Sequence, residues 1–408
     1  MRCRHCKAEL DLDLVDLGTS PPSNAYLRSG DLDAPEFWFP LRVKVCESCW
    51  LVQTEDFARH DDLFTDDYAY FSGFSEGWVA HCRTYADRMV RELGLDADST
   101  VVEVASNDGT LLREFHDRSI RCLGIEPTAG TAAASRRIGL EVVQEFLTVP
   151  VAERLRKDGL RADLLAANNV LAHVPDILGF AKACCILLAD AGVATFEFPH
   201  LMELVGGTQF DTIYHEHFSY LSLTAVAAVF EDAGLLIVDV EQLETHGGSL
   251  RVHARRADAG RRTPAGAVTD LLGLELAAGV ASRAFYEGFQ EAAQRVRDGL
   301  LRFLLDARES GRTVAGYGAA AKGNTLLNFA GVGQDMVEFV VDRNPVKQGM
   351  FLPGSRIPIV AEEHLRDRRP DHVLVLPWNL AGELASQLSY VTEWGGSIIT
   401  AVPEVRTW

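Results

Sequence analysis

Four cysteines near the N-terminus occur as two C-x-x-C pairs, Cys3 with Cys6 and Cys46 with Cys49. Each such turn can present two thiolates, and Zn²⁺ takes four of them in tetrahedral geometry. In a reducing compartment, paired C-x-x-C turns are more often metal sites than disulfides, although a disulfide pairing stays open. We therefore expect a zinc ion here. Because four thiolates fill its coordination shell, we expect it to be structural rather than catalytic.

The stretch V-V-E-V-A-S-N-D-G-T-L-L indicates a buried strand that turns into a helix at a cofactor site. Glu126 ends the next strand, R-C-L-G-I-E, where an acid usually accepts hydrogen bonds from ribose hydroxyls. The turn lacks G-x-G-x-x-G and carries carboxylates and amides, which favours a cationic adenosine such as S-adenosylmethionine over a dinucleotide. A purely structural turn is the alternative. The residues expected to contact the cofactor are Glu103, Ala105, Ser106, Asn107, Asp108, Gly109, Glu126, Pro127 and Asn169.

The segment Q-F-D-T-I-Y-H-E-H-F-S-Y-L places Tyr214, His215, Glu216 and His217 in succession. The H-x-H pattern lacks a clear third metal ligand and the H-E-x-x-H spacing is absent, so a metal site is disfavoured. Histidine, with an ordinary pKa of about 6.5, can accept a carbon-bound proton near neutral pH. We expect acid–base catalysis from this segment, with a structural role for each histidine as the alternative.

Two further places could supply groups to the same cleft. His173 follows the strand D-L-L-A-A-N-N-V, which should end at the carboxyl edge of the sheet, where ligands bind in such folds. Tyr68 and Tyr70, in D-D-Y-A-Y-F, could also reach it. The alternatives are a helix-entry loop for His173 and a place in the core for the tyrosines.

A second glycine-rich turn, A-G-Y-G-A-A-A-K-G-N-T, matches G-x-G-x-x-A from Gly316 onward, and Asp342 ends the next strand. This pattern alone predicts a nicotinamide dinucleotide and hence an oxidoreductase. A helix N-terminus of this kind can hold any pyrophosphate, however, including that of a nucleotide sugar, and Lys322 could add a cation. The turn is therefore more specific for pyrophosphate than for nicotinamide.

The elements that must position these residues alternate along the chain. Strands and helices follow one another from about residue 100, which predicts a mostly parallel, doubly wound α/β sheet. Two strands around a His-Gly-Gly turn follow at 235–255, then one or two long helices at 264–310, and the alternation restarts to the end of the chain. We expect three domains, at 1–65, 66–240 and 241–408, the last including the helical spacer.

Composition excludes some classes of function. A formal charge of −19 opposes nonspecific nucleic-acid binding through phosphates. An apolar run of about 18 residues, as a membrane span needs, is absent from the sequence. The start M-R-C-R-H-C-K-A-E-L is not that of a signal peptide, so we expect a cytoplasmic protein. The oligomeric state, monomer or dimer, stays open.

Taken in order, the motifs resemble one family. The cysteine pairs, V-E-V-A-S-N-D-G, G-I-E-P, N-x-x-x-H, Y-H-E-H-F, H-G-G-S-L-R and G-Y-G-A-A-A-K cover essentially the whole chain. This order resembles that of the S-adenosylmethionine-dependent nucleotide-sugar C-methyltransferases, which make branched-chain deoxysugars. The resemblance implies a zinc-binding domain, a class I methyltransferase domain and a C-terminal Rossmann-like domain without its own dinucleotide.

The resemblance also implies roles. His217 would be the general base, and Tyr68, His173, Tyr214 and Glu216 would orient substrate or stabilise charge. The expected substrate contacts are Gly318, Ala319, Lys322 and His246. The implied reaction methylates a carbon beside the keto group of a 4-keto-6-deoxy sugar, with dTDP as the expected nucleotide and C3 as the expected carbon. C5 and other nucleotides stay open.

The chain departs from the family at Ala105, where E-x-G-x-N-D-G usually has glycine. The added methyl group could tighten the turn, but alanine is the mildest such change, so the cofactor assignment stands. Two other functions stay open. One is a nucleotide-sugar oxidoreductase that uses NAD at the second glycine turn, and the other is a zinc-dependent interaction protein. The intact Asn107-Asp108-Gly109 turn and the dense Tyr214–His217 segment disfavour the latter.

Overall fold

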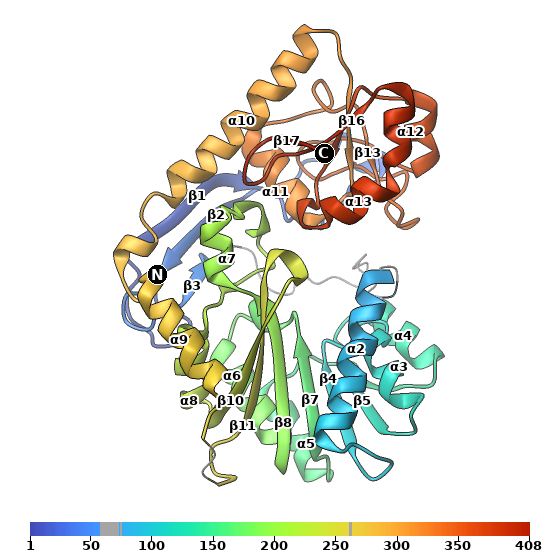
Figure 1. The fold of residues 1–408 in the computed structure, drawn as a ribbon. Coiled ribbons are helices and arrows are strands. Elements are labelled where there is room, and N and C mark those ends of the chain that lie inside the picture. The colour runs from blue at the N-terminus through green and yellow to red at the C-terminus, as the bar shows by residue number, and fades with distance from the viewer. Residues whose placement is uncertain (58–72, 74–75, 261–262) are drawn as a thin grey trace.

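A computed structural model describes residues 1–57, 73, 76–260 and 263–408. Its described strands form three sheets. Figure 1 shows a lower lobe built on the largest sheet, an upper lobe built from the C-terminal quarter of the chain, and the strands β1 and β2 at one side between them. No described helix is long and apolar enough to span a membrane.

The largest sheet has the order β10-β11-β8-β7-β4-β5-β6. The strands β6, β5, β4, β7 and β8 run parallel, while β11 is antiparallel to both of its neighbours. All five residues of β4, T-V-V-E-V, are buried, as in a parallel strand covered on both faces. The bounds are β4 Thr100–Val104, β5 Arg121–Ile125, β6 Glu141–Val143, β7 Ala162–Asn168, β8 Leu188–Pro199, β10 Leu235–Leu243 and β11 Ser249–Arg256.

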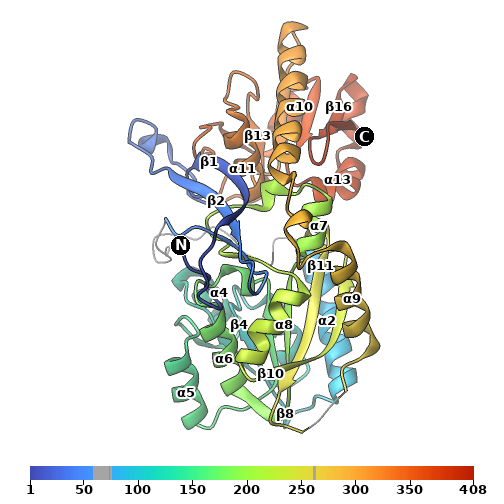
Figure 2. The same ribbon diagram turned by 90° about the vertical axis from the view of Figure 1, so that its left-hand side faces the viewer.

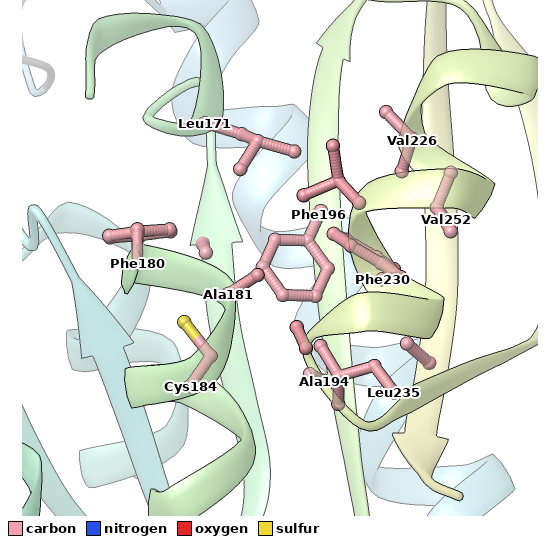
Figure 3. Close-up of a cluster of buried hydrophobic side chains, with 14 of the residues drawn as sticks. Leu171, Phe180, Ala181, Cys184, Ala194, Phe196, Val226, Phe230, Leu235 and Val252 are labelled. Carbon is pink, nitrogen blue, oxygen red and sulfur yellow. The ribbon is translucent and has the colours of Figure 1, made fainter. Parts of the chain in front are cut away.

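Helices cover both faces of this sheet, as the alternating pattern predicted. One face packs against α6 and α8, and Figure 3 shows Phe180 and Cys184 of α6 and Phe230 of α8 around Phe196 of β8. The other face packs against α2 and α3. The bounds are α2 Glu76–Leu93, α3 Thr110–His116, α4 Ala129–Arg137, α5 Val149–Lys157, α6 Ile177–Leu187, α7 Leu201–Gly206, α8 Leu223–Asp232 and α9 Gly266–Ala278.

The C-terminal sheet has the order β14-β13-β12-β15-β16-β17, which is the 3-2-1-4-5-6 order of a Rossmann fold. The second Rossmann-like unit is thereby confirmed. It is preceded by the long helix α10, whose buried residues recur every three or four positions. The bounds are α10 Phe289–Glu309, β12 Val314–Tyr317, α11 Ala321–Ala330, β13 Val340–Val341, β14 Ile359–Val360, α12 Glu362–Arg368, β15 His372–Val375, α13 Ala381–Gln387, β16 Ser397–Thr400 and β17 Arg406–Thr407.

The N-terminal segment joins the two lobes. Cys3, Leu10, Cys46 and Leu51 belong to the core of the largest sheet, whereas side chains of β1 and β2 belong to the core of the C-terminal lobe. Figure 2 shows the β1–β2 hairpin projecting to one side of α10. The third sheet has the order β1-β2-β3-β9, and its last strand comes from the middle of the chain. The bounds are β1 Leu12–Ser20, β2 Phe39–Val45, β3 Val52–Thr54 and β9 Ser219–Tyr220.

The expected division of the chain at residue 240 falls inside the strand β10, which pairs with β11. Residues from Leu235 to Arg256 form one antiparallel hairpin that continues the largest sheet through β8. Strands within one sheet share hydrogen bonds and a core, and Val268 and Leu271 of α9 belong to that same core. We therefore propose that the central unit extends through α9 and that the C-terminal unit begins after it.

Candidate active site between the two lobes

One large cavity, of about 770 Å³, lies where all three parts of the described chain meet. Its wall includes Asn24 from the N-terminal segment, the carboxyl ends of β4, β5 and β7, and residues 320–322 at the start of α11. A crevice at the carboxyl ends of parallel strands is the usual ligand site of a doubly wound sheet. The sequence-predicted site residues can therefore be sorted by whether they face this cavity.

Seven of the nine expected cofactor residues line it: Glu103, Ala105, Ser106, Asn107, Glu126, Pro127 and Asn169. Asp108 and Gly109 do not. The Asp108 carboxylate instead accepts the Thr110 hydroxyl at 2.6 Å and the Gly73 N–H at 2.9 Å, so it is engaged at the turn that leads into α3. Gly109 has φ +83°, and a Cβ there would lie 2.5 Å from a Leu140 methyl, so this position requires glycine for the turn itself.

The strand β4 ends in a turn with two left-handed residues, Ala105 at φ +56° and Asn107 at φ +50°. This conformation is costly for alanine, and it explains why glycine is usual at this position. It aims the Asn107 N–H at the Glu126 carboxylate, 2.9 Å away. The turn and the acid are thus fixed to each other before any ligand is bound.

The donors and acceptors at this end suit a cationic adenosine. Three buried side-chain acceptors around the turn, on Glu103, Ser106 and Asn168, have no hydrogen-bond partner within the described structure. Burial, with Asp108 and Glu126 nearby, holds the pKa of Glu103 well above its ordinary value. A ligand that brings hydroxyl and ammonium donors would satisfy these atoms, whereas a phosphate would meet carboxylates. S-adenosylmethionine fits this donor set.

The cavity wall also carries His173, Tyr214 and His217. The ring of His217 lies 4.6 Å from that of His173 and 3.9 Å from that of Tyr214, between centroids. A short 3₁₀ turn, Leu171–His173, follows β7 and places His173, as the sequence predicted. Both histidines and Tyr214 line the cavity wall.

Backbone carbonyls fix both imidazole tautomers. His217 Nδ1–H donates to the Thr212 carbonyl at 2.9 Å, and His173 Nδ1–H donates to the Glu216 carbonyl at 2.9 Å. Because a carbonyl can only accept, Nε2 of His217 carries the lone pair. Burial, reinforced by His173, His246 and Lys322, holds the pKa of His217 well below its ordinary value. His217 is therefore a neutral, oriented base at physiological pH.

The other members of the Tyr214–His217 segment turn away from the cavity. His215 pairs through Nε2 with the Pro40 carbonyl at 3.2 Å. Glu216 accepts from the Asn24 amide at 3.2 Å, and burial raises the pKa of its carboxyl. Glu216 thus reaches the cavity only through Asn24, which is part of the wall. Tyr68 and Tyr70 lie outside the described residues.

Only the last residues of the second glycine turn, where α11 begins, face the cavity. Ala320, Ala321 and Lys322 line the wall together with His246, but Gly318 and Ala319 do not. Gly318, at φ +86°, faces Pro377, where a Cβ would lie 2.6 Å from the ring. Of the expected substrate contacts, Lys322 and His246 are therefore in place, and Gly318 and Ala319 shape the turn behind them.

The protein itself occupies the polar groups of this turn. Asp342 accepts the Ala319 N–H at 2.8 Å, and the Ala319 carbonyl accepts from Tyr26 at 2.6 Å and from Lys347 at 2.7 Å. Lys347 also lines the cavity, although it belongs to no motif in the sequence. Asp342 does not line the cavity, so its carboxylate is not placed to hold the ribose of a ligand bound there.

Other residues of the cavity wall were not predicted from the sequence either, because they belong to no motif. The loop after β6, residues 145–148, faces the cavity with Phe146 and Leu147, the first two residues of α5 follow, and α2 contributes Trp78. Apolar residues in a loop and on a helix do not by themselves indicate a ligand site.

The four cysteines near the N-terminus form a single cluster. All four Sγ atoms lie within 4.8 Å of one another, with Cys3 and Cys49 at 3.6 Å and Cys6 and Cys46 at 3.4 Å. Tetrahedral Zn–S bonds of about 2.3 Å place sulfurs about 3.8 Å apart, so the cluster fits zinc, and no cysteine is in a disulfide. His5 pairs with Asp232 at 2.9 Å instead of completing the cluster.

Three family models match the chain in the expected order. They are a "Putative zinc binding domain" at 3–64, a methyltransferase domain at 78–240 and a C-methyltransferase C-terminal domain at 244–403. C-methyltransferase NovU from Streptomyces niveus is 36% identical over 404 residues, which cover 99% of this chain and 96% of that protein. These matches confirm the zinc-binding, methyltransferase and C-terminal parts that the motifs predicted, and they confirm the family that the motif order resembles.

Solved methyltransferases resemble the central unit only loosely. The magnesium protoporphyrin IX methyltransferase of Synechocystis PCC 6803, solved with bound S-adenosylhomocysteine, is 13% identical and matches 44% of this chain and 83% of its own, with a TM-score of 0.36. An S-adenosylmethionine-dependent methyltransferase from Clostridium acetobutylicum ATCC 824 is 10% identical over 44% and 92%, with a TM-score of 0.35. Such scores add nothing to the assignment. The full-length relative and the three family matches show that this chain belongs to the S-adenosylmethionine-dependent C-methyltransferases.

Proposed function

We propose that this C-methyltransferase acts on a nucleotide-linked 4-keto-6-deoxy sugar, in the biosynthesis of a branched-chain deoxysugar. The observation that carries the proposal is the place of His217 in the cavity. Its oriented imidazole lines the same cavity as the cofactor turn, and Lys322 and Lys347 from the C-terminal part of the chain line it too. A base, a cofactor end and a cationic end are what methylation beside a sugar ketone requires.

The chemistry follows from the acidity of a carbon beside a carbonyl. When bound, S-adenosylmethionine supplies an electrophilic methyl group on a sulfonium sulfur. His217 Nε2 removes the proton from the carbon beside the C4 ketone, and the electrons move to the ketone oxygen as an enolate. Tyr214 lines the cavity beside His217, and its hydroxyl stabilises the negative oxygen. His173, whose Nδ1–H is held by the Glu216 carbonyl, offers Nε2 as an acceptor that orients a substrate hydroxyl. The substrate carbon then needs only close alignment with the methyl group.

The cationic wall supports a nucleotide diphosphate as the handle of the substrate. Lys322 lies at the first turn of α11, 4.7 Å above the ring of Trp378, and Lys347 lies nearby on the same wall. Two ammonium groups beside a helix N-terminus favour an anionic diphosphate. With dTDP as the nucleotide, this arrangement directs the sugar toward His217. We expect methylation at C3; C5, which also flanks the ketone, is the alternative.

The direct test uses the zinc-containing protein, S-adenosylmethionine and a dTDP-linked 4-keto-2,6-dideoxy sugar. We expect a product heavier by one CH₂ unit, with the new methyl carbon located by NMR. A protein that binds neither S-adenosylmethionine nor its demethylated product would reject the proposal. Titration with NADH separates the oxidoreductase alternative, which requires tight binding near Gly318.

A second experiment tests the base. His217→Asn keeps a polar side chain but cannot accept the proton, so kcat should fall about 10²- to 10⁴-fold while S-adenosylhomocysteine still binds. His215→Asn is the matched control, because His215 faces Pro40 and should leave kcat nearly unchanged. Equal activity of the two variants would remove the base assignment.

A further inference from the structure

Hydrogen bonds lead from the cysteine cluster to the strand beside His217. The buried side chain of Gln53 donates to Cys3 Sγ at 3.4 Å and accepts the backbone N–H of Arg4 at 2.8 Å. Arg4 stands inside the first C-x-x-C turn, between Cys3 and Cys6. The geometry of the cysteine turn therefore decides where the side chain of Arg4 goes.

The Arg4 side chain is buried and points toward the histidines, not into solvent. Its guanidinium donates to the Thr54 carbonyl at 3.1 Å and to the Pro175 carbonyl at 3.4 Å, and it lies 4.9 Å above the ring of Phe218. Its carboxylate partner, Asp56, is more than half exposed. Burying a guanidinium is costly, so packing alone gives little reason for arginine at this place.

These contacts meet the two loops that carry the histidines. The Thr54 hydroxyl donates to the His217 carbonyl at 3.0 Å, and the Thr54 N–H donates to the Phe218 carbonyl at 3.2 Å. The Phe218 N–H in turn donates to the carbonyl of Ala172, next to His173, at 2.8 Å. Residues 172–175 and 216–218 are thereby bound to each other, and the Arg4 guanidinium bridges both through Pro175 and Phe218.

We propose that Arg4 is a positioning residue for methyl transfer, held by the zinc-binding turn and setting the alignment of His217 with His173. The inference rests on the proposed role of His217 as the base. It makes the cysteine cluster more than a remote stabiliser, because the ion that closes the turn also fixes the support of the catalytic loops. Misplacing a catalytic group by about 1 Å can cost about 10²-fold in rate.

The test compares Arg4→Met, which keeps the apolar stem but removes the donors, with Arg4→Lys, which restores the charge and the donors of a single nitrogen. Arg2→Met is the matched control, since Arg2 is an exposed residue in the same turn region. With S-adenosylmethionine and the dTDP-linked 4-keto-2,6-dideoxy sugar, we expect Arg4→Met to lower kcat about 10- to 100-fold and Arg4→Lys to recover part of it. Zinc content and the Kd of S-adenosylhomocysteine should stay unchanged.

A pH profile gives a readout that a loss of stability alone does not move. Loosening the loops admits water to His217, which relieves the burial that depresses its pKa, so the acidic limb of kcat should shift to higher pH in Arg4→Met. Thr54→Val removes only the hydroxyl bond to His217 and should shift the same limb less. If Arg4→Met does not fold, Thr54→Val decides.

Unchanged kcat and an unchanged acidic limb in both variants would overturn the inference, even if both melt at lower temperature. So would a loss of kcat in Arg4→Met that tracks loss of zinc while Thr54→Val stays normal. His217→Asn separates this result from failure of the proposed function. Normal turnover in His217→Asn rejects the base itself, whereas an inactive His217→Asn beside a normal Arg4→Met rejects only the positioning role.

Discussion

The two Rossmann-like units solve the same local problem in nearly the same way, yet only one keeps room for a cofactor. In each, the acid after the second strand accepts an N–H from the turn after the first strand. Glu126 accepts from Asn107 at 2.9 Å, and Asp342 accepts from Ala319 at 2.8 Å. Glu126 lines the cavity, whereas Asp342 does not.

The difference lies in what surrounds the turn. Buried acceptors without partners remain beside Glu126, including those of Glu103 and Ser106. Around Asp342, the Ala319 carbonyl is taken by Tyr26 and Lys347, and Pro377 fills the space in front of Gly318. A glycine turn followed by an acid therefore identifies the fold, but the space and the unsatisfied groups at the turn decide the ligand.

Replacing Glu126 and Asp342 with their amides tests this comparison, and we expect it to give the largest effect. We propose that Glu126 receives the ribose hydroxyls, so Glu126→Gln, which removes its charge, should raise the Kd of S-adenosylmethionine about 10- to 100-fold. Asp342→Asn should leave it within about twofold, because Asp342 faces its own turn. Isothermal titration of both variants provides the measurement. Equal weakening by the two substitutions would contradict the division of roles.

A substitution of Lys322 tests the same comparison at the C-terminal Rossmann-like unit. If the C-terminal turn holds the substrate diphosphate, Lys322→Met should raise KM for the nucleotide sugar about 10-fold, since one charge-assisted bond is lost. The Kd of S-adenosylmethionine should not change. Steady-state kinetics with saturating cofactor will measure this KM. A rise confined to the Kd of S-adenosylmethionine would contradict the prediction, because it would mean that Lys322 contacts the cofactor and not the substrate.

The pH dependence of folding stability should show that His246 is buried in the site and not exposed at the surface. Burial, with Lys322 nearby, lowers the pKa of His246 to about 4. The unfolded chain takes up this proton at about pH 6.5, so folding stability falls as pH drops from about 6.5 toward 4. His246→Asn tolerates the φ of +57° and removes this uptake. Its melting temperature should decline less between pH 7 and pH 5, and an identical decline would contradict the assignment.

The smallest effect is expected at Ala105. Replacing it with glycine relieves a left-handed alanine but adds backbone freedom to the unfolded chain, so stability should change by at most about 1 kcal/mol. Gly109→Ala is the contrasting change, because its Cβ would collide with Leu140 and should destabilise the protein clearly more. Chemical denaturation measures both. A large loss from Ala105→Gly would show that the methyl group has another role.

The fold was largely predictable because its signals are local. Apolar runs such as those of β4 and β7, and the two turn-and-acid pairs, predicted both doubly wound units, and the cysteine spacing predicted the metal cluster. The pairing of β11 within the central sheet was not predictable from residues 235–255, because a hairpin pattern does not say which sheet it joins.

The site was predictable only in part. Turn residues and histidines carry a signal in their own types, which identified Glu126, His173 and His217. The direction in which a side chain points does not follow from its residue type. The carboxylates of Glu216 and Asp108 turn away from the cavity because they accept hydrogen bonds from Asn24 and from Thr110 at the start of α3. Asn24 and Lys347 reach the cavity from distant parts of the chain, so tertiary packing alone brings them there.

The central claim is that His217 forms an enolate beside the sugar ketone, and hydrogen exchange tests it apart from methyl transfer. The protein is incubated in D₂O with S-adenosylhomocysteine and the dTDP-linked 4-keto-2,6-dideoxy sugar, and the C3 and C5 hydrogens are followed by NMR against a control without protein. We predict that the protein catalyses exchange at one of these carbons, C3, and that His217→Asn abolishes it. Exchange at C5 would move the methylation site, and exchange as fast in His217→Asn as in the unsubstituted protein would contradict the claim.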